Sequence, residues 1–312
     1  MILLRYKREL SVLGALVLAL LVLAEWGGGF YRPDQVRAVL VSNSPVLVAA
    51  VGMGLVIIAR HIDISIGSQF CICGVVAGIL AKMGVGMPVV VVATLFAGAV
   101  MGAANGVLVA MAGLPSIVVT LATLVIFREG LRWVREGEFV RNMPGGFQWF
   151  GLGQTAGQWM VVVVAVMVFG VVAWGMRNIA AGRAVYATGA DAEAARLAGI
   201  RPRRVVFWVF VAMGVLTGLA ALLNAVRFAD VDPNAGVGLE MQVIAAVVVG
   251  GVAVSGGRGT LMGCLIGVML LGVIGPGMVH LGRQPYWEKA IQGLIILVAV
   301  ASDAFYEREA RS

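Results

Sequence analysis

Charged residues are scarce in this sequence. Only 12% of its 312 residues are Asp, Glu, Lys or Arg, whereas 61% are hydrophobic and the mean hydropathy is +0.98. So little polar surface cannot cover a soluble globule, which excludes a soluble domain. We therefore expect an all-α polytopic membrane protein that lies in the bilayer as a single transmembrane domain over residues 1–312.

Residue patterns that metal sites and enzymes need are also missing. The chain has two histidines and three cysteines, of which Cys71 and Cys73 fall on opposite sides of a helix and Cys264 is distant, so we expect no metal site and no structural disulfide. Neither G-x-x-x-x-G-K-[ST] nor H-E-x-x-H occurs. Ser255 and His280 are the one pair to consider for a serine protease, and they lie at opposite ends of one expected helix, roughly 30 Å apart. We therefore expect no catalytic residues and no cofactor site in this chain.

Apolar segments are the main feature that the sequence does have. Runs of about 17 to 25 such residues cross a bilayer as helices. Ten segments reach or approach that length, the third, eighth and tenth being short: 10–24, 39–59, 66–81, 87–110, 117–133, 159–174, 205–225, 243–254, 261–280 and 290–301. The count predicts about ten transmembrane helices, some of them short or broken.

The distribution of basic residues predicts the orientation, because cytoplasmic loops retain Lys and Arg. Arg5, Lys7 and Arg8 place the N-terminus inside. The loop 175–204 carries six arginines against two acidic residues, a net +4 of the chain's +7, so it should also be cytoplasmic. Six crossings separate these two points and four more follow, which puts both termini inside. The net positive charge is explained by this topology and does not suggest nucleic acid.

One basic segment fits this topology less well. Four arginines in the last part of the fifth crossing and in the loop after it would face outside, and Glu129, Glu136 and Glu138 offset them only partly; the four are Arg128, Arg132, Arg135 and Arg141. Either this loop is functional or the count is wrong by two.

The loop 175–204 should contain a short docking helix. Thr188 and Asp191 are candidate N-caps, Glu193 lies in the first turn, and Gly199 is a candidate C-cap. The predicted two-turn helix, 191–198, would present small residues, namely Ala194, Ala195, Leu197 and Ala198. A rigid knob of this kind suits a cleft in another protein, although it could also be a plain interfacial helix.

Two polar segments interrupt the apolar sequence, at 59–68 and 250–260. Each breaks at a turn and restarts with small residues four apart, a weak internal repeat that paired broken helices of transporters also show. Both could equally be ordinary cytoplasmic turns. In the first segment, Arg60 is three residues from Asp63 and could be its partner. Glycines four apart elsewhere, such as Gly98 with Gly102 and Gly214 with Gly218, predict close helix packing.

Motifs spread over nearly the whole chain resemble one transporter family. They are Ile-Asp-Ile-Ser-Ile-Gly-Ser at 62–68, Asn-Gly-Val-Leu-Val at 105–109, Leu-Pro-Ser-Ile-Val-Val-Thr-Leu at 114–121, Tyr-Ala-Thr-Gly at 186–189, Ala-Ala-Arg-Leu-Ala-Gly-Ile at 194–200, and Val-Gly-Gly at 249–251 with Ser-Gly-Gly-Arg-Gly-Thr at 255–260. In this order they resemble the permease subunits of ABC importers for ribose, xylose, rhamnose and related sugars, a family that includes the autoinducer-2 permeases.

The resemblance implies a subunit of roughly ten helices in the bacterial inner membrane. It would pair with an identical or sibling permease, above two cytoplasmic ATPase domains that bind the ATP and below a periplasmic sugar-binding protein. The helix in 175–204 would be the coupling element, through Asp191, Glu193, Ala194, Ala195, Arg196, Leu197 and Gly199. The translocation path would involve Asp63, Ser65, Ser68, Asn105 and Thr120, with Thr123 as a further lining candidate.

The chain departs from the common sugar permeases at Arg60 and His61, where that family carries two glycines. The autoinducer-2 branch carries an Arg-Asn pair at this place, which Arg60-His61 resembles in part. Gly-Leu-Glu-Met at 238–241 resembles the autoinducer-2 branch or the rhamnose branch. An ion-coupled secondary transporter of a small polar solute is the alternative by composition. It would need no helix that docks on an ATPase.

Overall fold

The computed structural model describes residues 7–284, 287–294 and 297. Within them the chain is helical, apart from connecting segments and one isolated bridge between Val140 and Val231. The helices are α2 (Lys7–Trp26), α3 (Pro33–Ile58), α4 (Ile66–Lys82), α5 (Met87–Gly106), α6 (Ser116–Arg135), α7 (Gln154–Asn178), α8 (Ala180–Ala190), α9 (Ala192–Leu197), α10 (Pro202–Ala225), α11 (Leu239–Val249) and α12 (Leu261–His280), with a π-helical turn at Val107–Met111 and a 3-10 turn at Gln148–Gly151. The expected all-α class is confirmed.

Six helices are long and apolar enough to cross a membrane, namely α2, α3, α5 with its π turn, α7, α10 and α12. The helices α4 and α11 are apolar but shorter. Helix α6 occupies the expected segment 117–133 and carries four charged residues in its last two turns. The polytopic architecture is therefore confirmed, while the number ten stays a prediction. Of the expected tenth segment, 290–301, only residues 290–294 and 297 are described, and they are helical.

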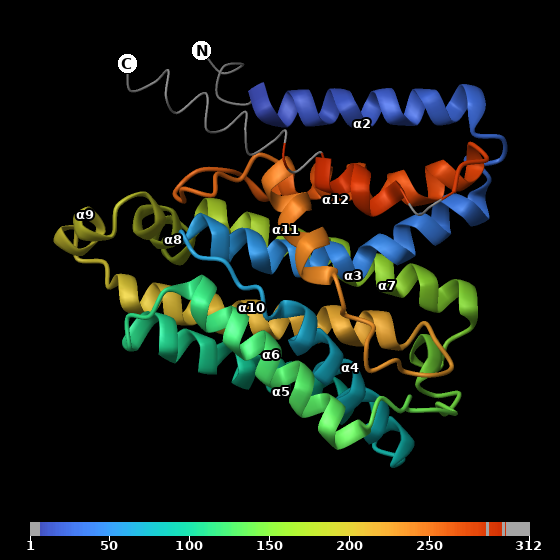
Figure 1. The fold of residues 1–312 in the computed structure, drawn as a ribbon, viewed down its shortest axis with the longest axis horizontal. Helices are drawn as coiled ribbons and strands as arrows, with labels where there is room; N and C mark the ends of the chain where they lie inside the picture. The colour runs from blue at the N-terminus through green and yellow to red at the C-terminus, as the bar shows by residue number, and fades with distance from the viewer. Residues whose placement is uncertain (1–6, 285–286, 295–296, 298–312) are drawn as a thin grey trace.

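Helix α3 forms the centre of the bundle, since nearly all residues of its most apolar window are buried. It contacts α10, α7, α12 and α11 (Figure 1). Helix α10 has its most extensive contact with α5, and glycines on both helices allow their backbones to come close together. A methyl group on Gly98 would overlap the carbonyl oxygen of Gly214, and one on Gly102 would overlap that of Phe210. The predicted packing of helices through small residues is thus confirmed here.

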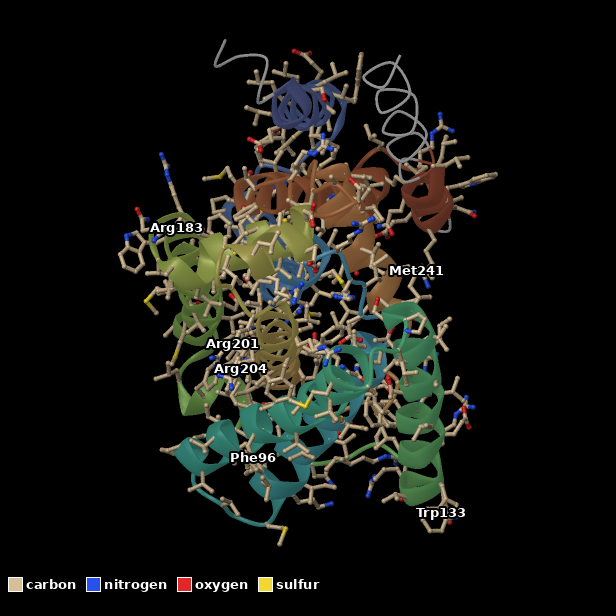
Figure 2. All side chains as sticks on the ribbon, turned by 90° about the vertical axis from the view of Figure 1, so that its left-hand side faces the viewer. Phe96, Trp133, Arg183, Arg201, Arg204 and Met241 are labelled. Atoms are coloured by element: carbon tan, nitrogen blue, oxygen red, sulfur yellow. The ribbon has the colours of Figure 1, made fainter. Side chains whose placement is uncertain are left out.

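The outer helices turn large apolar side chains outward. Val92 and Phe96 on α5 and Val171 on α7 are each about two-thirds exposed, as is Ile126 on α6 (Phe96 is labelled in Figure 2). Exposed apolar stripes would be unfavourable in water, whereas lipid solvates them. This surface agrees with the membrane location that the composition predicts.

The connections gather at two opposite ends of the bundle (Figure 1). The helices α8 and α9 and the segment 250–260 lie at one end, which we call the α8–α9 end. The segments 27–32, 136–153 and 226–238 lie at the other, which we call the loop end. There the bridge between Val140 and Val231 holds two of these segments together.

Candidate functional site

Helix α9 has a well-formed cap at each end. The Asp191 carboxylate accepts hydrogen bonds from the backbone N–H groups of Glu193 (2.9 Å) and Ala194 (3.0 Å), as the sequence predicts for an N-cap. At the other end Gly199 has φ +83°, a left-handed conformation that glycine adopts without steric strain. Two caps on six residues fix a helix that would otherwise be too short to persist.

The outward face of α9 differs in part from the predicted one. Leu197 is 79% exposed and Ala194 is exposed, but Ala195 is only 4% exposed and contributes to the core rather than to a docking surface. An exposed ion pair joins Arg196 to Glu193 at 2.6 Å. Three of the four predicted residues are therefore exposed beside this pair, namely Ala194, Leu197 and Ala198.

The segment before α9 is a helix that the sequence analysis missed. The chain forms α8 from Ala180 to Ala190, so 175–204 is mostly helical instead of a loop with one short helix. Thr188 lies inside α8 and is buried, so its assignment as a candidate N-cap was wrong. All six arginines of this segment are exposed at the α8–α9 end, where Figure 2 labels Arg183, Arg201 and Arg204.

Helix α8 meets both polar breaks of the chain at one junction. The Gly257 backbone N–H donates to the carbonyl oxygen of Ile58 at 2.8 Å, which joins the end of α3 to the segment 250–260. Gly189 of α8 lies against the same carbonyl, because a methyl group on Gly189 would overlap it and would come within 2.8 Å of Gly257 N. Three segments far apart in sequence are thus in backbone contact. We call Gly189, Ile58 and Gly257 the junction.

Tyr186 adds a second tie between α8 and the segment 250–260. Its hydroxyl donates a hydrogen bond of 2.9 Å to the carbonyl oxygen of Gly259. Burial, with smaller contributions from Cys264 and Glu9, raises the pKa of the Tyr186 hydroxyl above its usual value, so this group remains a donor at neutral pH. Thr260, next in sequence, caps α12 through the Gly263 N–H and donates to the Glu9 carboxylate at 2.7 Å.

Each of the two breaks lies between two apolar helices, α3 and α4 around the first and α11 and α12 around the second, and the lengths of these helices differ between the two places. After the break at 59–65 comes the short helix α4, whereas after 250–260 comes α12, a helix of 20 residues. The short helix of the second half is α11, which precedes its break. Both breaks contact α8 at the junction. If the α8–α9 end is cytoplasmic, both breaks are also turns on the cytoplasmic side, which is one of the two alternatives from the sequence.

A buried hydrogen-bonded cluster fixes the start of α4. One oxygen of Asp63 accepts from the backbone N–H (2.9 Å) and the hydroxyl (2.6 Å) of Ser65. Its other oxygen accepts from the amide groups of Gln69 (3.2 Å) and Asn105 (3.5 Å). These two amides also donate to the Ser65 hydroxyl, at 2.7 and 2.8 Å. All four residues are completely buried, so the carboxylate is stabilised by four donors where water cannot reach it.

Two residues of α6, Ser116 and Thr120, contact the chain segment that leads into this cluster. The Ile62 N–H donates to the Ser116 hydroxyl at 3.4 Å. The Thr120 hydroxyl lies 3.3 Å from the carbonyl oxygen of Ile62, although its shorter hydrogen bond, 2.9 Å, is to the Ser116 carbonyl oxygen of its own helix. The hydroxyls of Ser68 and Thr123 contact only nearby carbonyl oxygens, at Ser65 and Thr120. The structure thus brings Asp63, Ser65 and Asn105 together, with Thr120 nearby, and leaves Ser68 and Thr123 to local contacts.

Arg60 does not pair with Asp63. Its side chain is exposed while Asp63 is fully buried, and the ion pairs among the described residues do not join them. The expected partnership was wrong because the backbone turns between the two residues: Arg60 has φ +69°. This left-handed conformation costs a non-glycine residue about 1 kcal/mol or more.

The short helices α4 and α11 begin against each other inside the bundle. A methyl group on Gly67, in the first turn of α4, would overlap the Glu240 carboxylate and lie 2.5 Å from the Gly236 carbonyl oxygen. Glu240 is in the first turn of α11 and is 8% exposed. Its carboxylate lies 3.7 Å from Nη2 of Arg128 on α6. Charged groups within a membrane bundle are costly and usually functional.

Comparison with known proteins assigns this arrangement to a family. A family model described as "Branched-chain amino acid transport system / permease component" matches residues 35–300. The chain belongs to this permease family. It is 33% identical over 301 residues to the autoinducer 2 import system permease protein LsrC of Salmonella typhi, covering 95% of this chain and 86% of that protein. It is also 33% identical over 304 residues to the ribose import permease protein RbsC of Escherichia coli strain K12, covering 95% and 93%. No solved structure matches it.

Sequence reasoning missed several residues of this permease. Gln69 could have been found from its position four residues after Ser65 on α4, which places both on one helix face. Tyr186 and Gly189 lie in a motif that carries the family resemblance, but no local pattern says what they contact. Arg128 and Glu240 are 112 positions apart, and only the fold brings them together.

Proposed function

We propose that this permease forms the membrane path of an ATP-driven importer of a neutral, monosaccharide-like solute, of the ribose, xylose and rhamnose class or autoinducer-2. The observation that carries this proposal is the pair of relatives, whose printed names are ribose and autoinducer 2 import permeases and which align with 95% of the chain. The substrate is uncharged, so binding would depend on hydroxyl and amide groups more than on net charge.

A separate cytoplasmic subunit would bind and hydrolyse ATP. The α8–α9 end is suited to such a partner, because α9 is rigidly capped and exposes Leu197 to 79%. The six exposed arginines place positive charge around it, as is typical of the cytoplasmic side. The loop end would then face a periplasmic binding protein, with both termini in the cytoplasm of a bacterial inner-membrane protein.

The residues of the buried cluster would shape the path rather than line it directly. Asp63, Ser65 and Asn105 hold the start of α4, and Thr120 holds Ile62 from the side of α6. Of this stretch, Arg60 is exposed and His61 and Ile62 are partly so. We place these three at the wall of the path, with Ser68 one turn further along α4. A second permease, identical or a sibling, would complete the path.

A pull-down tests the partner assignment. The tagged chain is extracted from native membranes in mild detergent, and copurifying proteins are identified by mass spectrometry. An ATPase and a second permease should be recovered with the wild type, and the ATPase should be lost with Ala194→Glu combined with Leu197→Glu. Because Ala195 is buried, Ala195→Ser is the matched control for a small change on the inward face.

The contrary result is equally clear. If the chain purifies alone and proteoliposomes containing only this chain accumulate sugar on an ion gradient, the ATP-driven proposal fails. The chain would then be an ion-coupled carrier.

A further inference from the structure

The starting point is the place where α4 and α11 begin. Gly67 and Gly236 are in backbone contact, since a methyl group on either would overlap or crowd the other's carbonyl oxygen. The first turns of both helices therefore lie side by side, and their unpaired N–H groups create a positive potential there. Broken helices of transporters place substrate sites at such positions. The start of a helix does not by itself make a binding site, so the side chains at this point must supply the evidence for one.

Glu240 is the side chain that occupies this point. Only 8% of Glu240 is exposed, whereas its neighbour Met241, which is labelled in Figure 2, is 60% exposed. Its Oε2 atom is buried, lies beside Gly67 and has no hydrogen-bond partner. An unpaired buried carboxylate oxygen costs free energy, on the order of 1–3 kcal/mol or more. This atom is an acceptor that requires a donor.

Arg128 supplies the complementary unsatisfied groups. Its Nη2 atom is 3.7 Å from Oε1 of Glu240, which is an ion pair but too long for a hydrogen bond. Both Nε and Nη2 of Arg128 are buried without a hydrogen-bond partner. The pair is therefore open: it balances charge while it leaves two donors and one acceptor free.

A small pocket reaches Arg128 from the loop end. It has room for about one water molecule. Cys71, Gly137 and Asn234 line it together with Arg128. Gly137 and Asn234 belong to the connections at the loop end, so the pocket opens on Arg128 from that side. Glu240 does not line the pocket; its Oε1 atom lies 3.7 Å behind Nη2 of Arg128.

A hydroxyl group matches this arrangement. Its oxygen accepts a hydrogen bond from the Arg128 guanidinium, and its hydrogen is donated to the Glu240 carboxylate. A neutral ligand keeps the ion pair balanced, whereas an anion would be repelled by Glu240 and a cation by Arg128. We propose that Glu240 and Arg128 form a subsite that binds a hydroxyl group of the transported solute. This subsite rests on the proposed function, and the same chemistry could be satisfied by a bound water.

The test compares a sugar with its deoxy derivatives. Proteoliposomes contain the permease with its ATPase and binding protein, and ATP-dependent uptake is measured for the member of a ribose, xylose, rhamnose and autoinducer-2 panel that the wild type transports. The readout is the ratio of uptake rates for that sugar and each single-deoxy derivative. Since the binding protein is the same throughout, only the change in this ratio between permease variants reports on the permease.

Glu240→Gln and Arg128→Lys should each reduce the ratio by about tenfold for one deoxy position, the equivalent of one lost hydrogen bond of about 1.4 kcal/mol. Glu129→Gln is the matched control, because Glu129 is exposed and pairs with Arg132 on the same helix. The control should keep the wild-type ratio. Thermal unfolding and ATPase association identify a variant that does not fold, and in that case the other member of the pair decides.

Equal loss of uptake for sugar and deoxy derivatives would overturn the subsite and leave a structural ion pair. If Glu240→Gln and Arg128→Lys leave the uptake of both the sugar and its deoxy derivatives unchanged, the subsite is also overturned. The position would then hold only a water molecule. If the wild type takes up no sugar of the panel under ATP, the proposed function itself fails, and that failure is visible before any variant is compared.

Discussion

Gly189 of α8 lies directly against the carbonyl oxygen of Ile58, the last residue of α3. The same oxygen accepts the Gly257 N–H at 2.8 Å, so a movement of α8 acts on the central helix and on the segment before α12 together. If this end docks on an ATPase as proposed, these contacts would carry its movement to the other helices. The junction thus connects the α8–α9 end to the core of the permease.

The junction predicts that Gly189→Ala uncouples ATP hydrolysis from transport. The added methyl group would overlap the Ile58 carbonyl and must push α8 away, at about 1–3 kcal/mol. We expect ATPase activity of the reconstituted complex to persist while sugar uptake per ATP falls several-fold. Gly170→Ala in α7 is the control, because nothing lies within 4 Å of its new methyl group. Wild-type coupling in Gly189→Ala would show that the junction transmits nothing.

The buried cluster predicts a large loss of stability for Asp63→Ala. The change removes the acceptor of the Ser65 N–H and hydroxyl and of two amide groups, all without access to water. The free energy of unfolding should fall by about 2 kcal/mol or more. Thermal unfolding of the purified protein measures it. Ser68→Ala is the comparison, since it loses one bond within α4, and an equal effect of both changes would contradict the role of the cluster.

The cap of α9 predicts a graded effect of substitutions at Asp191. Alanine removes the acceptor of the Glu193 and Ala194 N–H groups and should destabilise the helix by about 1 kcal/mol. Binding of the ATPase subunit should weaken by about fivefold or more, because part of the binding free energy must then order α9. Asp191→Asn keeps an acceptor and should bind nearly as the wild type does. Surface-immobilised complexes give both affinities, and equal weakening by Ala and Asn would point to charge rather than capping.

The conformation of Arg60 predicts that Arg60→Gly stabilises the protein. Glycine adopts φ +69° without the steric penalty of a side chain, which is worth about 1 kcal/mol. The unfolding temperature should therefore rise. Arg60→Ala removes the same charge but retains the strain, so it separates backbone from side-chain effects. A lower stability of Arg60→Gly would mean that the exposed guanidinium makes a favourable contact in the membrane.

The sequence alone determined the class of this protein and most of its helices. Apolar runs mark membrane helices reliably, because lipid tolerates almost no unpaired backbone and the required length is fixed by the bilayer. The cap at Asp191 and the turn at Gly199 were also predictable, since both depend on residues within a few positions. The motifs at 62–68, 186–189 and 255–260 indicated the permease family that the comparison with known proteins shows.

The tertiary structure decided what those residues touch. Ala195 was expected on the docking surface and is buried. Which face of the short helix α9 packs inward depends on the position and direction of α8, which precedes it. The sequence could not show that the short helices α4 and α11 begin against each other, because they are separated by more than 150 residues. Contacts such as Gly189 with Ile58 and Arg128 with Glu240 join residues more than 100 positions apart. Local sequence sets helix length and caps, whereas such contacts depend on how all the helices pack at once.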